Sequence, residues 1–107
     1  MPDEDQLGAA VRKLIGQVAH WTPSRWAASS VSGPARSDLV HEAIQWLADR
    51  SAEAEGRPAV PVPRLDNDLA LPDQMRVVAA DLARFGSPDD VVQAADRVNA
   101  VRRALSS

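Results

Sequence analysis

Residues 85–91 read FGSPDDV, and this stretch sets the arrangement of the second half of the chain. Ser87 is a favoured N-cap residue, the proline after it is tolerated in the first helical turn, and two aspartates follow at the positive end of the helix dipole. The stretch therefore predicts a helix that runs to about Leu105. Because only Gly86 and Ser87 separate this helix from the helical pattern before it, the two helices are expected to fold back as an antiparallel hairpin.

Three further stretches show apolar residues at helical spacing. They predict helices over residues 3–20, from Ala35 or Asp38 to Glu55, and from 72 to 85. Gly56 is a plausible C-terminal cap for the second of these helices. The four apolar stripes are Leu7, Ala10, Val11, Leu14 and Val18; Val40, Ala43, Ile44 and Leu47; Leu71, Met75, Val78, Ala79, Leu82 and Phe85; and Val91, Ala94, Ala95, Val98 and Val101.

Two connecting segments are distinctive. Thr22 as N-cap predicts a short helix over residues 23–29, followed by a Ser-rich turn to Gly33 and Pro34. Residues 57–71, the crossover segment, contain three prolines in six residues, which exclude helix and favour extended or polyproline-like chain. At this length we expect the segment to pack along the helices or to have a role of its own. A strand within 59–62 would need a partner from a second copy.

These elements predict one all-α domain over residues 1–107. We expect a four-helix bundle with a short extra helix after the first helix and the Pro-rich crossover segment between the second and third long helices. The first two long helices would form the other pair.

The composition is that of a soluble globular protein, with 45% hydrophobic and 25% charged residues. Much of the apolar content is Ala and Val, so the core is built from small side chains, and self-association would compensate for this. There are no cysteines, which excludes disulfides and thiolate metal sites.

The charge pattern argues against two classes of partner. The net charge is −3 and no basic stripe is visible, so nucleic-acid binding is not expected. The acidic N-terminus does not resemble a signal peptide, and no apolar run is long enough to cross a bilayer, so we expect a cytoplasmic protein with no membrane association. Eleven arginines against one lysine suggest a GC-rich bacterial source.

The two histidines, His20 and His41, are candidates for acid–base or metal chemistry, because only histidine titrates unperturbed near neutral pH. Each falls away from the apolar stripe of its helix, so we expect solvated or boundary residues that remain polar candidates only. Residues 66–68, Asp-Asn-Asp, followed by Asp73, resemble the start of a calcium loop, but the later ligand positions are apolar. We expect no metal and no cofactor.

The three tryptophans allow two interpretations. In the first, all three wedge the short helix against the long helices. In the second, tryptophan and arginine side chains form a partly exposed binding patch, since both types are enriched at binding hot spots. The candidate binding residues are Trp21, Arg25, Trp26, Leu39, Trp46 and Arg50. Solvent exposure of Trp26 separates the two interpretations.

The leading functional hypothesis is a non-enzymatic helical protein–protein interaction module, such as an adaptor, an antitoxin-like or immunity-type protein, or a regulatory accessory protein. Its partner would be another protein or a second copy. The alternative is a small-molecule-binding protein or minimal helical enzyme with a pocket lined by the three tryptophans and with His20, His41 or Arg25 as its polar contact. The Pro-Val-Pro-Arg stretch of the crossover segment is also compatible with a polyproline ligand for a partner, although a structural role is the preferred interpretation.

Overall fold

A computed structural model describes residues 2–31 and 33–106, with side chains from residue 6 onward, and within them the chain is all-helical, with no β-strand. Met1 and Ser107, the ends of the predicted domain, and Ser32, in the predicted Ser-rich turn, lie outside the described residues. The helices are α1 (Pro2–Val18), α2 (Pro23–Ala27), α3 (Arg36–Ala54), the 3₁₀ helix η1 (Asp68–Ala70), α4 (Leu71–Phe85) and α5 (Pro88–Leu105).

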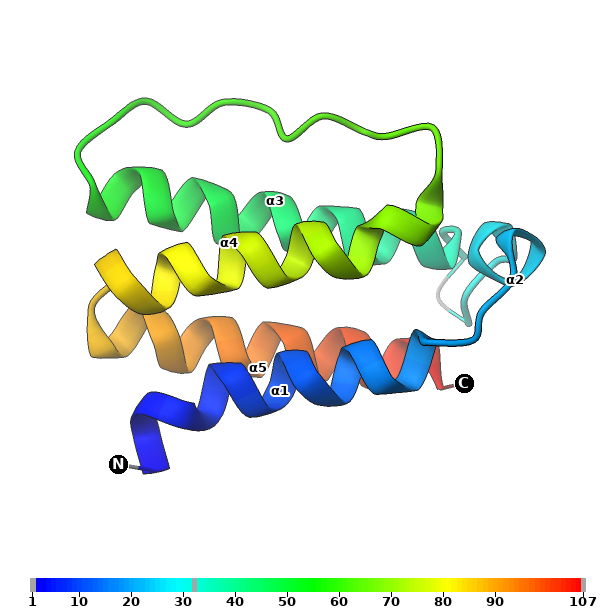
Figure 1. The fold of residues 1–107 in the computed structure, drawn as a ribbon, viewed down its shortest axis with the longest axis horizontal. Helices are drawn as coiled ribbons and strands as arrows, with labels where there is room; N and C mark the ends of the chain where they lie inside the picture. The colour runs from blue at the N-terminus through cyan, green and yellow to red at the C-terminus, as the bar shows by residue number, and fades with distance from the viewer. Residues whose placement is uncertain (1, 32, 107) are drawn as a thin grey trace.

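The four long helices lie side by side in two layers, α1 with α4 and α3 with α5 (Figure 1). Figure 1 also shows that α1 and α5 run in one direction, whereas α3 and α4 run in the other. The most extensive contacts join the parallel helices, α1 with α5 and α3 with α4. The predicted hairpin of α4 and α5 is antiparallel, but these helices contact each other much less, and α1 and α3 are not among the closely packed pairs that we expected.

The crossover segment explains why α3 and α4 are parallel. It runs back over the outside of both helices, from the end of α3 to the start of α4 (Figure 1). Helix α3 has 19 residues and therefore spans about 28 Å at 1.5 Å per residue. The non-helical residues 55–67 cover that distance easily at about 3.1 Å per residue of polyproline-like chain. The helical turn η1 at the end of the segment is a difference from the prediction, and Asn67 caps it by accepting a hydrogen bond from the Leu69 amide at 3.0 Å.

The predicted starts of α2 and α5 are confirmed by their capping contacts. The Ser87 hydroxyl accepts from the Asp90 amide and the Asp90 carboxylate accepts from the Ser87 amide, both at 3.1 Å, which makes a reciprocal capping box. Gly86 stands in the turn before it, where an added Cβ would lie 2.7 Å from the carbonyl oxygen of Leu82. Thr22 caps α2 in the same way, by accepting from the Arg25 amide at 3.2 Å.

The C-terminus of α3 is closed by Gly56, as predicted. Gly56 has a φ of +71° and donates to the Glu53 carbonyl at 3.1 Å, and Arg57 donates to the Ala52 carbonyl at 3.0 Å. These two bonds form a Schellman motif, which satisfies carbonyls at the end of the helix. By contrast, α2 ends two residues earlier than predicted, because the chain becomes extended at Ala28 and pairs with the stretch that leads into α3.

The predicted apolar stripes form one core. Their members are buried except for Val78 and Val101, which are half-buried, and Phe85, which is 44% exposed. Phe85 is the last residue of α4, so no neighbouring helix covers its ring, and the Arg84 guanidinium lies over it at 5.2 Å. None of the helices in the described part of the chain has the length and hydropathy of a membrane span.

Candidate functional site

The tryptophans occupy two separate places. Trp26, on α2, is 1% exposed and belongs to the core, so it closes the corner where α2 packs on α3 and η1 and is not available to a partner. Trp21 is half-buried beside it, with the two rings edge to face at a centroid distance of 4.9 Å. At this corner the structure matches the wedge interpretation.

Two arginines cover the outer face of Trp21. The guanidinium of Arg25 lies 5.0 Å from the centre of the Trp21 ring and that of Arg36 lies 5.6 Å away. Arg36 also donates to the Arg25 carbonyl at 3.3 Å, which ties the start of α3 to α2. The contacts of Arg25 with Trp21 and Arg36 therefore give it a structural role at this corner.

Trp46 lies elsewhere, ten residues beyond Arg36 on α3, which is about 15 Å along the helix axis. It lines a surface groove of about 570 Å³ between α3 and α5. The predicted residue Leu39 lines the same groove, and Arg50 lies at one end of it. The lining residues are Leu39, Glu42, Ala43 and Trp46 from α3 and Gln93, Asp96, Arg97, Ala100, Val101 and Ala104 from α5.

Two guanidinium groups lie over the Trp46 ring. Arg97 of α5 lies 4.7 Å and Arg50 lies 5.2 Å from the centre of the Trp46 ring, both within the range of cation–π attraction. Arg50 is fixed further by a 2.8 Å hydrogen bond to Gln93, which donates in turn to Asp89 at 2.7 Å. Side chains from both α3 and α5 therefore position Trp46, which forms the aromatic wall of the groove.

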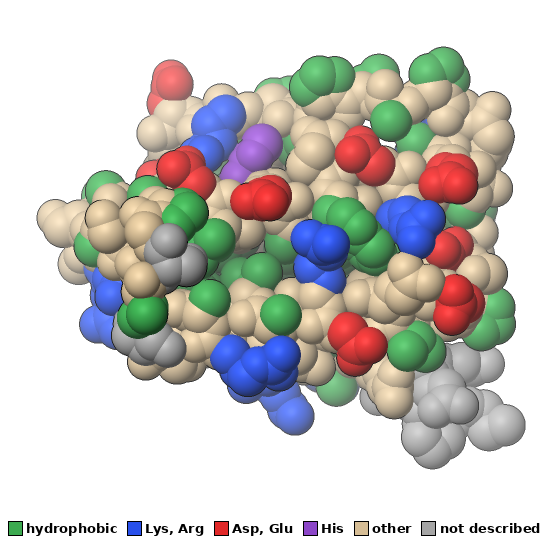
Figure 2. Space-filling model, turned by 180° about the vertical axis from the view of Figure 1, so that it is seen from behind, with side chains coloured by type: hydrophobic (Ala, Val, Ile, Leu, Met, Phe, Trp, Pro, Cys, Tyr) green, Lys and Arg blue, Asp and Glu red, His purple; other side chains and the backbone are tan. Residues whose placement is uncertain are grey.

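The charged side chains on the rim of the groove are not neutralised by neighbouring groups of the described chain. Glu42, Asp96 and Arg97 are exposed, and within the described residues none of them has a hydrogen bond or ion pair. Figure 2, which views the molecule from the side of α3 and α5, shows hydrophobic side chains between two basic groups near the middle of this face, beside a hollow and with acidic side chains around them. The groove thus combines an apolar lining with uncompensated charges of both signs.

The α5 side of the groove was not predicted from the sequence. Its apolar members are mainly alanines, which do not stand out as binding residues. The available signal is their spacing, since Gln93, Arg97, Ala100 and Ala104 repeat at three and four residues on a face adjacent to the buried stripe.

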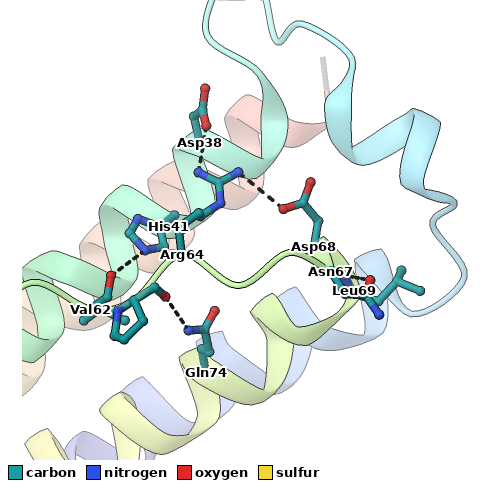
Figure 3. A network of polar contacts seen from close by, with 9 residues as sticks. Asp38, His41, Val62, Arg64, Asn67, Asp68, Leu69 and Gln74 are labelled. Atoms are coloured by element: carbon teal, nitrogen blue, oxygen red, sulfur yellow. Dashed lines mark hydrogen bonds and ion pairs between the residues drawn. The ribbon is translucent and has the colours of Figure 1, made fainter.

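The two histidines are not part of this groove. His20 is exposed in the turn after α1. His41 is half-buried under the crossover segment, and its Nε2 lies 3.1 Å from the Val62 carbonyl oxygen (Figure 3). Because a carbonyl oxygen only accepts, this nitrogen carries the proton. His41 is thus a boundary residue, one of the two positions expected for it, and it makes a structural contact.

Further polar side chains hold the crossover segment by its main chain. Gln45 accepts from the Val62 amide at 2.6 Å and donates to the Val60 carbonyl at 3.1 Å, so its carboxamide replaces the neighbouring strand that this extended chain lacks. Gln74 of α4 donates to the Pro63 carbonyl at 3.0 Å. The face of α3 that carries His41 and Gln45 is therefore the face on which the segment rests.

Arg64 anchors the end of this network (Figure 3). It donates to Asp38 at 2.9 Å and to Asp68 at 3.4 Å. The hydrogen bond to Asp38 raises the pKa of the Arg64 guanidinium. Asp68 is thus used as an ion-pair partner and Asn67 as a cap, and within the part of the chain that the structure describes no group of three His, Asp or Glu side chains could hold a metal ion.

No protein-family model, curated protein or solved structure matches the chain.

Proposed function

We propose that the four long helices form a four-helix bundle and that this bundle serves as a non-enzymatic protein–protein interaction module in the bacterial cytoplasm. Its docking site is the groove between α3 and α5. The role of an adaptor, an antitoxin-like or immunity-type protein, or a regulatory accessory protein fits such a module.

One observation carries the proposal: the groove has an apolar lining, while Glu42, Asp96 and Arg97 on its rim have no hydrogen-bond or ion-pair partner within the described chain. Tryptophan and arginine contribute most to binding energy at protein interfaces, and Trp46 with Arg97 provides both. A groove between two helices also suits a helical partner, which would place apolar side chains on the floor and charged side chains on the rim.

The histidines favour binding over catalysis. His41 is engaged with the Val62 carbonyl, and His20 is exposed in the turn after α1. Neither histidine lines the groove.

Site-specific photo-crosslinking tests the proposal. A photoreactive benzoylphenylalanine in place of Ala100, an exposed residue of the groove, is expected to give a protein adduct in the source cells. The adduct should be lost when Trp46→Ala and Arg97→Glu are added, because they remove the aromatic wall and reverse the charge beside it.

Ala80 provides a matched control, since it is an exposed alanine in the groove between α1 and α4 on the opposite layer. The same photoreactive residue at this position should give no adduct. Adducts of equal yield from both positions, or an adduct that survives Trp46→Ala with Arg97→Glu, would contradict the proposal.

A small-molecule ligand is the second candidate function, because a volume of about 570 Å³ lies within the range of ligand pockets. Native mass spectrometry of the protein purified from its source would show an added mass in the wild type. That mass should disappear when Ala100→Trp fills the groove, and its persistence would exclude this groove as the ligand site.

A further inference from the structure

The packing of the four long helices leaves one seam open on each side of the molecule. The parallel pairs, α1 with α5 and α3 with α4, are packed more extensively than the antiparallel pairs. Surface grooves accordingly follow both antiparallel seams, one between α3 and α5 and one between α1 and α4. The two grooves differ in charge, and this difference indicates what each can bind.

The α3/α5 groove is self-complementary in charge. Its rim carries the carboxylates of Glu42 and Asp96 and the guanidinium of Arg97, and none of them is neutralised within the described residues. A partner surface with charges of only one sign would be repelled by part of this rim. A second copy presents carboxylates and a guanidinium on the same surface, so each protomer can pair its cation with an anion of the other.

The described lining of the α1/α4 groove lacks this property. Among the described side chains, its charged lining residues are Arg12 and Arg76. Arg76 is paired with Asp73 at 2.9 Å, and Arg12 also has an interaction within the chain. Neither arginine is left to pair with a carboxylate of a second copy. The α1/α4 groove is therefore a poor surface for self-association.

The helix geometry also suits a symmetric pair on the α3/α5 face. Helix axes pack 8–10 Å apart, depending on the side chains between them. Ala43, Ala100 and Ala104 keep the floor of the groove low, so helices of a second copy can approach it closely. In a two-fold dimer each such contact forms twice, which adds apolar burial to a core built mainly from small side chains.

We propose that the α3/α5 face is the interface of a closed homodimer. Helices α3 and α5 of the two protomers pack on each other, Trp46 becomes buried, and Arg97 pairs with Glu42 or Asp96 of the partner subunit. This inference rests on the proposed function, since it identifies the protein that occupies the docking groove.

Charge reversal at exposed positions tests the dimer without disturbing the fold. Sedimentation velocity of the full chain is expected to show twice the mass of the 11.5 kDa monomer. Arg97→Glu makes the face acidic, and Glu42→Arg with Asp96→Arg makes it basic, so each variant should raise the dimer Kd at least about tenfold, the effect expected for a strong interface residue. An equimolar mixture of the two variants should restore the dimer, because opposite faces then meet.

Arg76→Glu serves as the control on the opposite groove and should leave the dimer unchanged, and circular dichroism confirms that all variants are folded. A dimer that resists both groove variants, or that dissociates with Arg76→Glu, would overturn the proposed face. A wild-type chain that stays monomeric up to millimolar concentration would overturn the homodimer. In that case a photo-crosslinked adduct at position 100 with another protein would leave the proposed function intact, whereas no adduct would remove both.

Discussion

Replacing Gln45 with methionine tests whether side chains, and not apolar packing alone, hold the crossover segment. Methionine is similar to glutamine in length, flexibility and helix propensity, so the change removes mainly the hydrogen bonds. Gln45 exchanges two of these with the segment, at 2.6 Å with the Val62 amide and at 3.1 Å with the Val60 carbonyl.

The expected loss follows from the exposure of each partner. Val60 is 62% exposed, so water can replace the bond to its carbonyl at little cost. Val62 is half-buried, and its amide loses a bond that water replaces less well. A hydrogen bond contributes about 0.5–1.5 kcal/mol net and an unsatisfied buried group costs about 1–3 kcal/mol, so we expect unfolding to become easier by about 1–2 kcal/mol.

Two assays measure this effect. Urea denaturation followed by circular dichroism gives the free energy of unfolding, and Tm should fall by about 4–8 °C for each kcal/mol in a domain near this size. Hydrogen exchange should show a faster Val62 amide in Gln45→Met, while core amides slow to exchange in the wild type change only by the global loss of stability. Gln6→Met, at an exposed glutamine with no side-chain hydrogen bond within the described residues, is the matched control. Unchanged protection of Val62 together with a loss below about 0.5 kcal/mol, the usual range for surface substitutions, would refute the reasoning.

Three further substitutions probe the corner and the turn. Trp26→Ala should cost about 3–5 kcal/mol in chemical denaturation, because it empties a buried site, and a cost under 1 kcal/mol would contradict the core position of this ring. Ser87→Ala should cost about 1 kcal/mol by removing one half of the capping box with Asp90, and a Tm equal to the wild type would show that the box contributes nothing. Gly86→Ala should cost about 1–3 kcal/mol, because its Cβ would meet the Leu82 carbonyl at 2.7 Å, and thermal unfolding without any loss would mean that the turn can relax.

Local signals in the sequence were sufficient to predict most helix boundaries. Ser87 and Thr22 were identified as caps because the residue itself supplies the hydrogen bond that starts the helix. Gly56 was identified because few other residues adopt its positive φ. Each of these features depends on residues within a few positions of one another, so the sequence contains the complete information.

The pairing of helices was less predictable, because it depends on residues far apart in the chain. A short turn between α4 and α5 fixed their antiparallel direction, but not which helices pack together. The parallel arrangement of α3 and α4 follows from the path of the crossover segment, and its length alone was compatible with other routes.

The candidate site was predicted only in part, because it too depends on residues that are far apart in the chain. Leu39, Trp46 and Arg50 were predicted as candidate binding residues, and all three lie at the groove. Arg97 was not recognised, because its importance depends on lying against Trp46 across the groove. The contact of His41 was not predicted for a similar reason, since the carbonyl that engages it comes from residue 62.

The contacts of the crossover segment have a consequence for protein engineering. Gln45, His41 and Gln74 bind peptide groups of the segment, and these groups are the same whatever side chain each residue carries. The outward-facing side chains of residues 57–61 are exposed and take little part in the core. A foreign linear epitope that keeps an extended backbone could therefore be grafted at these positions and displayed on a rigid helical scaffold, on a different side of the molecule from the α3/α5 groove.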